Sequence, residues 1–294
     1  MDHQRLLDLE EKCIQDFPPA CVATCPVHVD ARSFAAAINS GDFTRAMEIY
    51  SKTVPFPGII GRVCEHPCQA ACKRREAGEA ISLAALEKYC VQMSPTSRAK
   101  ISVRPKKDQR VAVVGAGLSG LTAAFDLAVR GYDVVLFEAK DRLGGSLRDF
   151  AEEVLPRAVI AEDTAVLADL GVELKLDAAV GKTFSLTDLR GDFAAVYLGL
   201  GKNPQDTLGL ELDPEGRINI NPDTYGTNLA GVFAAGSMFT GRDYLPIASL
   251  AGGRRAAISI DRYLQGVSLT AMRENEGPYQ TRLYTSLEGI EPVP

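Results

Sequence analysis

The sequence predicts an α/β protein in which an N-terminal α-helical domain precedes a Rossmann-like domain with a parallel sheet. Three observations support this fold class. All seven cysteines lie in the first third of the chain, among segments with the apolar spacing of short helices. A strand, a glycine-rich turn, a helix and a second strand then follow Arg110, which is typical of a βαβ unit. Further short apolar runs continue toward residue 264.

Capping residues and apolar periodicity predict the individual elements. An amphipathic first helix carries Leu6, Leu7 and Leu9 and leads to Cys13. Three later helices follow capping residues: 31–39 after Asp30, 43–53 after Asp42 and 83–93 after Ser82. Strands are expected within the segments 111–117, 133–139, 172–176, 194–200 and 231–236, with helices over 118–131 and 252–264.

These elements define the expected domain boundaries. Residues 1–100 form the helical domain, 101–109 a polar and basic linker, 110–266 the nucleotide-binding domain and 267–294 a polar tail. The tail is expected to be disordered or to lie on a partner subunit.

The composition excludes several classes of protein. A net charge of −6 argues against general electrostatic binding of nucleic acid. The apolar stretch 111–129 is long enough for a membrane span, but its glycines and Asp126 belong to a nucleotide-binding pattern, so no span is predicted. The N-terminus lacks the layout of a secretory signal, and the chain is expected to be cytoplasmic. In that compartment clustered thiols suggest metal binding rather than disulfides.

A glycine motif marks a dinucleotide site. Gly115, Gly117 and Gly120 form G-x-G-x-x-G between a strand and a helix, and Glu138 ends the next strand. The first glycine allows a tight turn, the second lets a pyrophosphate approach the backbone, and the third permits close packing of helix on strand. The phosphate charge is expected at the helix N-terminus, and the carboxylate of Glu138 on the ribose hydroxyls.

The sequence that follows resembles the two-domain FAD flavoproteins. Asp141 to Gly145 resembles their second glycine signature, and the strand 231–236 precedes a helix that starts near Pro246. The resemblance implies FAD, with the N-terminus of that late helix directed at the flavin ring. That group has Asp where this chain has Ser237. The implied FAD-binding residues are Gly115, Gly117, Leu118, Ser119, Gly120, Glu138, Ala139, Arg142, Gly144, Gly145, Val180, Gly199, Gly201, Gly236, Ser237, Pro246 and Ile247.

The cysteine spacings are suited to thiolate ligation of iron–sulfur clusters. Cys21 and Cys25 precede Pro26, and Cys64, Cys68 and Cys72 follow at regular intervals. The alternative is a structural zinc domain, but the paired CxxC knuckles of such domains are missing. His66, between two of these cysteines, is expected beside the ligands or at the surface rather than on the metal.

The cysteine pattern followed by the FAD motifs resembles the small (beta) subunit of glutamate synthase and the N-terminal half of dihydropyrimidine dehydrogenase. The resemblance implies two 4Fe-4S clusters. One would be held by Cys13, Asp16, Cys21 and Cys72, with Asp16 where the family has cysteine; the other would be held by Cys25, Cys64, Cys68 and Glu87. Cys90, one helical turn after Glu87, is an alternative ligand, although a buried structural thiol is the commoner role.

One expected module is missing. The family interrupts the FAD domain with a second Rossmann domain that binds NAD(P), whereas here a strand ending near Gly201 is followed within a few dozen residues by the strand at Gly231. No second glycine motif and no hydrolytic triad or HExxH motif occurs. Arg254 and Arg255 on the late helix are expected to face solvent or a partner.

The favoured hypothesis is therefore an FAD and iron–sulfur electron-transfer subunit of a hetero-oligomeric oxidoreductase, not a complete enzyme. Its partners would be other redox subunits, with ferredoxin as a further candidate. The first alternative is a self-contained NAD(P)H-dependent flavin oxidoreductase. The second is a non-redox assembly subunit.

Overall fold

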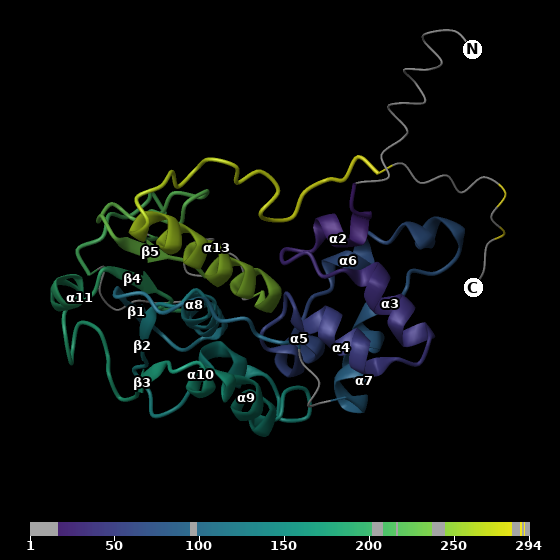
Figure 1. Cartoon of the computed structure of the whole chain (residues 1–294), viewed down its shortest axis with the longest axis horizontal. Helices are drawn as coiled ribbons and strands as arrows, with labels where there is room; N and C mark the ends of the chain where they lie inside the picture. Colours follow the sequence, from purple (N-terminus) through teal and green to yellow (C-terminus); the bar gives the residue numbers. More distant parts are fainter. Residues whose placement is uncertain are drawn as a thin grey trace, which may run out of the picture. The chain divides into compact units, whose positions relative to one another are not determined.

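The computed structural model of the chain forms two compact units (Figure 1). The structure describes residues 17–94, 99–201, 208–215, 217–236, 245–283, 289 and 291. The first unit, called the helical unit here, takes its described residues from 1–54, 65–99 and 275–294; the second, the sheet unit, takes them from 55–64 and 100–274. The predicted first helix, Cys13, Asp16 and Ser237 lie outside the described residues.

The helical unit is built from short helices around a small apolar core. Its helices are α2 (Ala20–Thr24), α3 (Ala31–Asn39), α4 (Phe43–Ser51), α6 (Pro67–Ala70), the 3₁₀ helix η1 (Lys73–Ala77) and α7 (Leu83–Met93). Asp30 and Asp42 cap α3 and α4 as predicted, since their carboxylates accept from backbone N–H groups at 3.1 and 2.9 Å. Phe34, Met47 and Tyr50 are fully buried where α3, α4 and α7 pack together.

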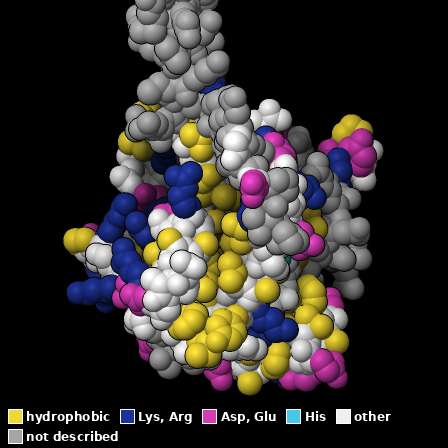
Figure 2. All heavy atoms as spheres, turned by 90° about the vertical axis from the view of Figure 1, so that its right-hand side faces the viewer, with side chains coloured by type: hydrophobic (Ala, Val, Ile, Leu, Met, Phe, Trp, Pro, Cys, Tyr) yellow, Lys and Arg dark blue, Asp and Glu magenta, His cyan; other side chains and the backbone are white. Residues whose placement is uncertain are grey.

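Helix α7 also has an exposed apolar side. Tyr89 is 48% exposed and Met93 52% exposed. Figure 2 shows hydrophobic side chains reaching the surface among charged ones on the face that it draws. Single exposed apolar residues of this kind are common on protein surfaces, so they do not by themselves mark an interface.

A C-terminal segment, 275–283, packs on the helical unit of its own chain. The backbone N–H of Tyr279 donates to the carbonyl of Ala23 at 2.9 Å, and its ring lies 5.5 Å from that of His28. Nε2 of His28 lies 3.0 Å from the carbonyl oxygen of Asn275. This part of the expected tail therefore has an intramolecular partner, which the sequence analysis did not foresee.

The sheet unit is a five-stranded parallel sheet, which confirms the predicted fold class. Its strands are β1 (Arg110–Val114), β2 (Asp133–Phe137), β3 (Glu173–Lys175), β4 (Ala195–Leu198) and β5 (Val232–Ala234), in the order β3-β2-β1-β4-β5. Every neighbouring pair is parallel. β1, β2, β4 and β5 are continuous apolar runs, as expected for strands covered on both faces.

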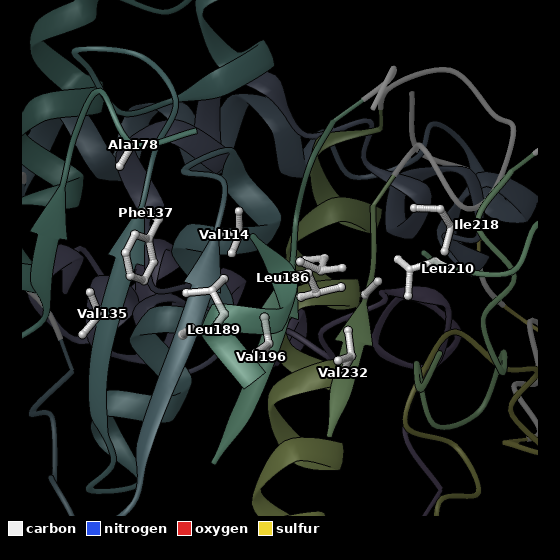
Figure 3. Close-up of a cluster of buried hydrophobic side chains, with 13 residues drawn as sticks. Val114, Val135, Phe137, Ala178, Leu186, Leu189, Val196, Leu210, Ile218 and Val232 are labelled. Atoms are coloured by element: carbon white, nitrogen blue, oxygen red, sulfur yellow. The ribbon is translucent and has the colours of Figure 1, made fainter. Parts of the chain in front are cut away.

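Helices cover one face of this sheet, and an apolar cluster with one further helix covers the other. The helices of the unit are α5 (Pro57–Val63), α8 (Leu118–Val129), η2 (Gly145–Asp149), α9 (Arg157–Thr164), α10 (Val166–Asp169), α11 (Leu186–Asp192) and α13 (Pro246–Leu264). α13 lies along α8, and both contact the strands (Figure 1). On the other side, Val114, Phe137 and Val196 pack with Leu186 and Leu189 of α11 (Figure 3). Among the described residues, no helix has both the length and the apolar character needed to cross a membrane.

Helix α5 belongs to the sheet unit although it lies inside the expected helical domain. All but one of its residues are buried, and it packs against α9. The carboxylate of the buried Asp163 accepts from the backbone N–H of Ile59 at 2.7 Å, in the first turn of α5. This bond satisfies one of the free N–H groups that every helix leaves at its start. The apolar composition of α5 and this bond explain why the segment leaves the helical unit.

The segment 101–109, expected as a linker, packs on the sheet unit. The N–H of Arg104 donates to the carbonyl of Val129 at 2.9 Å, and Nζ of Lys107 donates to Asp261 of α13 at 2.7 Å. Burial favours a higher pKa for Asp261, but hydrogen bonds, that from Lys107 foremost, outweigh it and hold the pKa below its ordinary value. A basic stretch that looks solvated in the sequence therefore has fixed contacts.

The helices α8 and α13 approach closely because glycine lies at their contact. A Cβ atom on Gly253 would lie 2.1 Å from the carbonyl oxygen of Ser119. Arg254 of α13 donates to the buried carboxylate of Asp126 of α8 at 2.9 Å. The expectation that Arg254 faces solvent or a partner is therefore wrong, because a buried carboxylate of its own chain requires a charged partner.

Replacing Gly253 by alanine should destabilise the sheet unit, because the new methyl group meets backbone rather than a movable side chain. We expect a loss of about 1–3 kcal/mol in the free energy of unfolding, measured by urea denaturation. The control is Gly191→Ala at an exposed position of α11, where nothing lies within 4 Å of the added atom. That change should stabilise the helix by up to about 1 kcal/mol. Equal effects of the two substitutions would contradict the packing described here.

Candidate functional site

The sheet unit contains a cleft of about 510 Å³ at the carboxyl ends of its strands. The N-terminal turn of α8 and the loops after β1, β2 and β4 line it. Ligands of open α/β sheets bind at this edge, outside the carboxyl ends of the strands. The cleft therefore has the position expected of a nucleotide site.

The three motif glycines have different roles in the geometry of the turn. A Cβ atom on Gly115, whose φ is +98°, would lie 2.3 Å from the carbonyl oxygen of Gly199, and one on Gly120 would lie 1.8 Å from that of Gly115. Nothing lies within 4 Å of the same position on Gly117, which lines the cleft. Two glycines thus permit close backbone packing, while Gly117 leaves room for a ligand beside the start of α8.

Glu138 holds the turn together from the end of β2. It is only 8% exposed, and its two carboxylate oxygens accept from the backbone N–H groups of Ala116 and Lys140 at 2.7 and 3.0 Å. Each carboxylate oxygen has two lone pairs, so both retain the capacity to accept from a ligand hydroxyl at the cleft. The carboxylate is fixed by the backbone before any ligand binds.

Most of the residues predicted for the nucleotide site line this cleft. They are Gly115, Gly117, Leu118, Ser119, Glu138, Ala139, Gly145, Val180, Gly199, Gly201 and Gly236. Gly120, Arg142, Gly144, Pro246 and Ile247 are absent from its lining. Gly120 lies beneath the turn, and Arg142 is an exposed side chain 3.5 Å from Asp141.

The cleft also has lining residues that the sequence did not indicate. The polar ones are Lys140, Ser146, Asp149, Lys182 and Ser249. Lys140 stands two residues after Glu138 and could have been found from that position. The others lie in η2, in a turn or on α13 and outside the predicted motifs, so the fold brings them to the cleft.

A buried tyrosine holds Ser119 in the first turn of α8. The hydroxyl of Tyr197 on β4 is hydrogen-bonded to the hydroxyl of Ser119. Tyr197 is fully buried, and burial raises its pKa well above the ordinary value. The phenol is therefore a neutral hydrogen-bonding group under all ordinary conditions, and it fixes a side chain that lines the cleft.

The second candidate site is a group of thiols in the helical unit, of which Cys25, Cys68 and Cys72 are buried and Cys21 is half-buried. α2 and the residue after it carry Cys21 and Cys25, and α2 packs against α6, which carries Cys68 and is followed by Cys72. Burial raises the pKa of Cys68 to about 12, with the charges of Glu87 and Cys25 adding to the effect. Burial also raises the pKa of Cys21, and Cys72 adds to it. We call these four cysteines and Glu87 the thiol group.

The chemistry of the thiol group fits a cationic metal centre. Thiolates close to one another and to a carboxylate repel, so binding as thiolates requires positive charge to balance them. Iron supplies such charge, and cluster ligands bind as thiolates. Among the described residues, no three His, Cys, Asp or Glu side chains converge closely enough to bind one metal ion. A cluster holds its ligands farther apart than a single ion does.

Two further described cysteines, Cys64 and Cys90, are not members of this group as defined. Cys64 directly follows α5 and is assigned to the sheet unit. Cys90 is buried on α7, where burial raises its pKa to about 11, and its thiol donates to the carbonyl of Phe43 at 3.6 Å. This hydrogen bond to the backbone at the start of α4 is the contact that the structure gives for the Cys90 thiol.

Glu87 has two hydrogen-bonding partners that the sequence did not predict. Its carboxylate is 5% exposed, and Oε2 accepts from the hydroxyl of Tyr50 at 3.0 Å. Nε2 of His66 lies 3.2 Å from the same oxygen. His66 was expected beside the ligands or at the surface, and its contact with Glu87 agrees with the first of these.

Comparison with known proteins identifies both units. Residues 1–99 match the family described as dihydropyrimidine dehydrogenase domain II, 4Fe-4S cluster. Residues 77–281 match the pyridine nucleotide-disulphide oxidoreductase family. Both matches agree with the resemblance stated from the sequence.

Curated relatives share about 30% identity. The NADPH-Fe(3+) oxidoreductase subunit beta of Geobacter sulfurreducens is 30% identical over 208 residues, which are 69% of this chain and 31% of that protein. The glutamate synthase (NADPH) small chain of Escherichia coli is 29% identical over 206 residues, 68% of this chain and 44% of that one. The NAD-dependent dihydropyrimidine dehydrogenase subunit PreT of Salmonella typhimurium is 29% identical over 202 residues, 67% of this chain and 49% of that one.

The chain thus spans about a third to a half of the length of these relatives. The second family match covers more than half of the chain, and the parallel sheet with its glycine turn agrees with it. The chain therefore belongs to the pyridine nucleotide-disulphide oxidoreductase family and carries an N-terminal domain of the 4Fe-4S type.

Proposed function

We propose that this chain is an electron-transfer subunit of a multi-subunit oxidoreductase, with FAD in the sheet unit and two 4Fe-4S clusters bound by the N-terminal cysteines. The main support is the thiol group, a set of buried donors with no evident role without iron, in a chain that also has a dinucleotide cleft. FAD exchanges one or two electrons and the clusters carry single electrons, so the pair is suited to relaying electrons.

The cleft residues support FAD rather than a smaller ligand. The free N–H groups at the start of α8 and the space beside Gly117 suit a pyrophosphate. The fixed carboxylate of Glu138 suits ribose hydroxyls. Ser249, in the first turn of α13, lines the same cleft, so the positive end of that helix would face the flavin ring and stabilise negative charge on it.

The proposed cluster ligands are those that the resemblance implies. Cys13, Asp16, Cys21 and Cys72 would hold one cluster, and Cys25, Cys64, Cys68 and Glu87 the other. Cys72 interacts electrostatically with Cys21, and Cys68 interacts with Glu87, Cys25 and Cys21, so the thiols of both proposed sets lie near one another. A carboxylate in place of a thiolate would alter the potential of its cluster.

A subunit is favoured over a complete enzyme by the connection between β4 and β5. Its described residues, 208–215 and 217–231, contain turns and isolated bridges but no helix or strand of the kind that a second nucleotide-binding domain needs. The relatives also include chains named as oxidoreductase subunits. We therefore propose that partner redox subunits, with ferredoxin as a further candidate, exchange electrons with this chain in the cytoplasm.

Cofactor content tests the proposal directly. Protein purified under anaerobic conditions should contain one FAD and about eight iron atoms per chain, since each cluster holds four. Flavin is measured by release and chromatography, iron by elemental analysis and the clusters by electron paramagnetic resonance after dithionite reduction. Flavin without iron, or zinc in place of iron, would refute the electron-transfer function.

Paired cysteine variants test the thiol group. Cys68→Ser should lose about half of the iron, because serine does not replace a thiolate in a buried cluster site. Cys90→Ser should retain it, because Cys90 bonds to the backbone of α4 instead. Iron content and the visible absorption of the clusters give the answer. If both variants lost the same amount of iron, either Cys90 would itself be a cluster ligand or the loss would reflect misfolding.

A self-contained NAD(P)H oxidoreductase is the second candidate, because the relatives above are named for NADPH or NAD. In anaerobic stopped-flow mixing, the isolated chain should show no rapid bleaching of its flavin with NADH or NADPH if it is an electron-transfer subunit. Rapid bleaching by either nucleotide would instead favour this second candidate.

A further inference from the structure

Tyr50, His66 and Glu87 form a buried polar cluster in the helical unit that the proposed function does not account for. Glu87 is on α7, Tyr50 is on α4, and His66 immediately precedes α6. The side chains of Glu87 and His66 are 6% and 13% exposed, and Tyr50 is fully buried. Burying a charged carboxylate is costly unless donors compensate it, so this arrangement has to be maintained by specific contacts.

The two donors converge on one carboxylate oxygen. The hydroxyl of Tyr50 and Nε2 of His66 lie 3.0 and 3.2 Å from Oε2 of Glu87. No residue in the described part of the chain makes a hydrogen bond with Oε1. Both donors occupy Oε2, so Oε1 keeps its capacity to accept a hydrogen bond or to bind a cation.

The backbone at His66 is consistent with a functional requirement. His66 has φ +50° and ψ +55°, the left-handed conformation that non-glycine residues rarely adopt. Pro67 follows it and starts α6, which carries Cys68. The contact of its imidazole with Glu87 gives a reason for a side chain at this position, where glycine would adopt the backbone conformation without strain.

Glu87 lies beside the thiol group, because α7 packs against α6 and His66, two residues before Cys68, contacts the carboxylate. The charge of Glu87 also acts on Cys25 and Cys68, two of the proposed ligands of the same cluster. Oε1 is the carboxylate oxygen that neither Tyr50 nor His66 engages. A carboxylate held by outer hydrogen bonds is a common arrangement at metal centres, where such partners orient the ligand and tune the metal.

We propose that Tyr50 and His66 are positioning residues that engage Oε2 of Glu87 and so present Oε1 as a single-oxygen ligand to iron. The inference rests on the proposed function, since it requires a cluster at the thiol group. Both donors draw negative charge away from the ligand oxygen, so they should also raise the potential of that cluster.

The sharpest test is Tyr50→Phe in the full chain purified under anaerobic conditions. The variant removes one hydroxyl and keeps the buried ring. We expect the midpoint potential of one of the two clusters to become more negative and its resonance signal to change. Release of iron to a chelator should be about 10-fold faster or more, because the ligand is less firmly held. Tyr89→Phe on α7 is the matched control, since that ring is exposed, and it should change none of these values.

Two further variants separate the possible outcomes. His66→Asn tolerates the left-handed backbone but loses the imidazole, and it should shift the same cluster in the same direction. Glu87→Gln removes the negative charge and should shift that cluster to a more positive potential. If Tyr50→Phe does not fold, the His66 variant decides by the same criteria.

The inference is overturned if Glu87→Gln shifts a cluster while Tyr50→Phe and His66→Asn leave its potential, signal and iron release unchanged. It is also overturned if Glu87→Gln itself changes no cluster, since Glu87 is then not a ligand. In both cases the iron and FAD content would still support the proposed function. Wild-type protein without iron would instead refute the proposed function itself.

Discussion

Buried negative charge is the constraint on which the helical unit depends. Its cysteines and Glu87 come from α2, α6, α7 and the residues that follow α2 and α6, and all but the half-buried Cys21 are buried. Burial raises the pKa of the Cys21, Cys25 and Cys68 thiols, and neighbouring negative charge adds to this effect. Such a group is stable as neutral thiols or as ligands of a cation, but not as free ions. Packing of α3, α4 and α7 around a small apolar core and the caps of α3 and α4 hold the surrounding helices.

The sheet unit has a different constraint, because backbone N–H groups must be exposed to a ligand while the helices and the sheet stay in close contact. Glycines at the turn and at the contact of α8 with α13 make this possible, because side chains there would meet backbone atoms. Fixed side chains then complete the site. Glu138 is held by two N–H groups, and Ser119 is held by the phenol of Tyr197. The cleft is therefore largely organised before a ligand enters.

Three segments pack in a unit that their composition does not predict. α5 leaves the cysteine-rich region to pack in the sheet unit, the basic segment 101–109 is bound along that unit, and 275–283 returns to the helical unit. Each is explained by particular contacts: the carboxylate of Asp163 at α5, Lys107 on Asp261, and the backbone of Tyr279 on Ala23. The boundaries of the units are thus set by long-range hydrogen bonds, not by position along the chain.

The sequence by itself determined the fold class, the strands of the sheet, the caps of α3 and α4 and most residues that line the cleft. These features follow from local rules: apolar periodicity, capping preference, and the glycines that a tight turn requires. The family resemblance was likewise carried by motifs that are contiguous in the chain. Only the tertiary structure decided that Lys182 and Asp149 reach the cleft, that Arg254 pairs with Asp126, and that Tyr50 and His66 bond to Glu87. Those contacts join residues far apart in the sequence, and their partners are chosen by packing geometry, which no local pattern encodes.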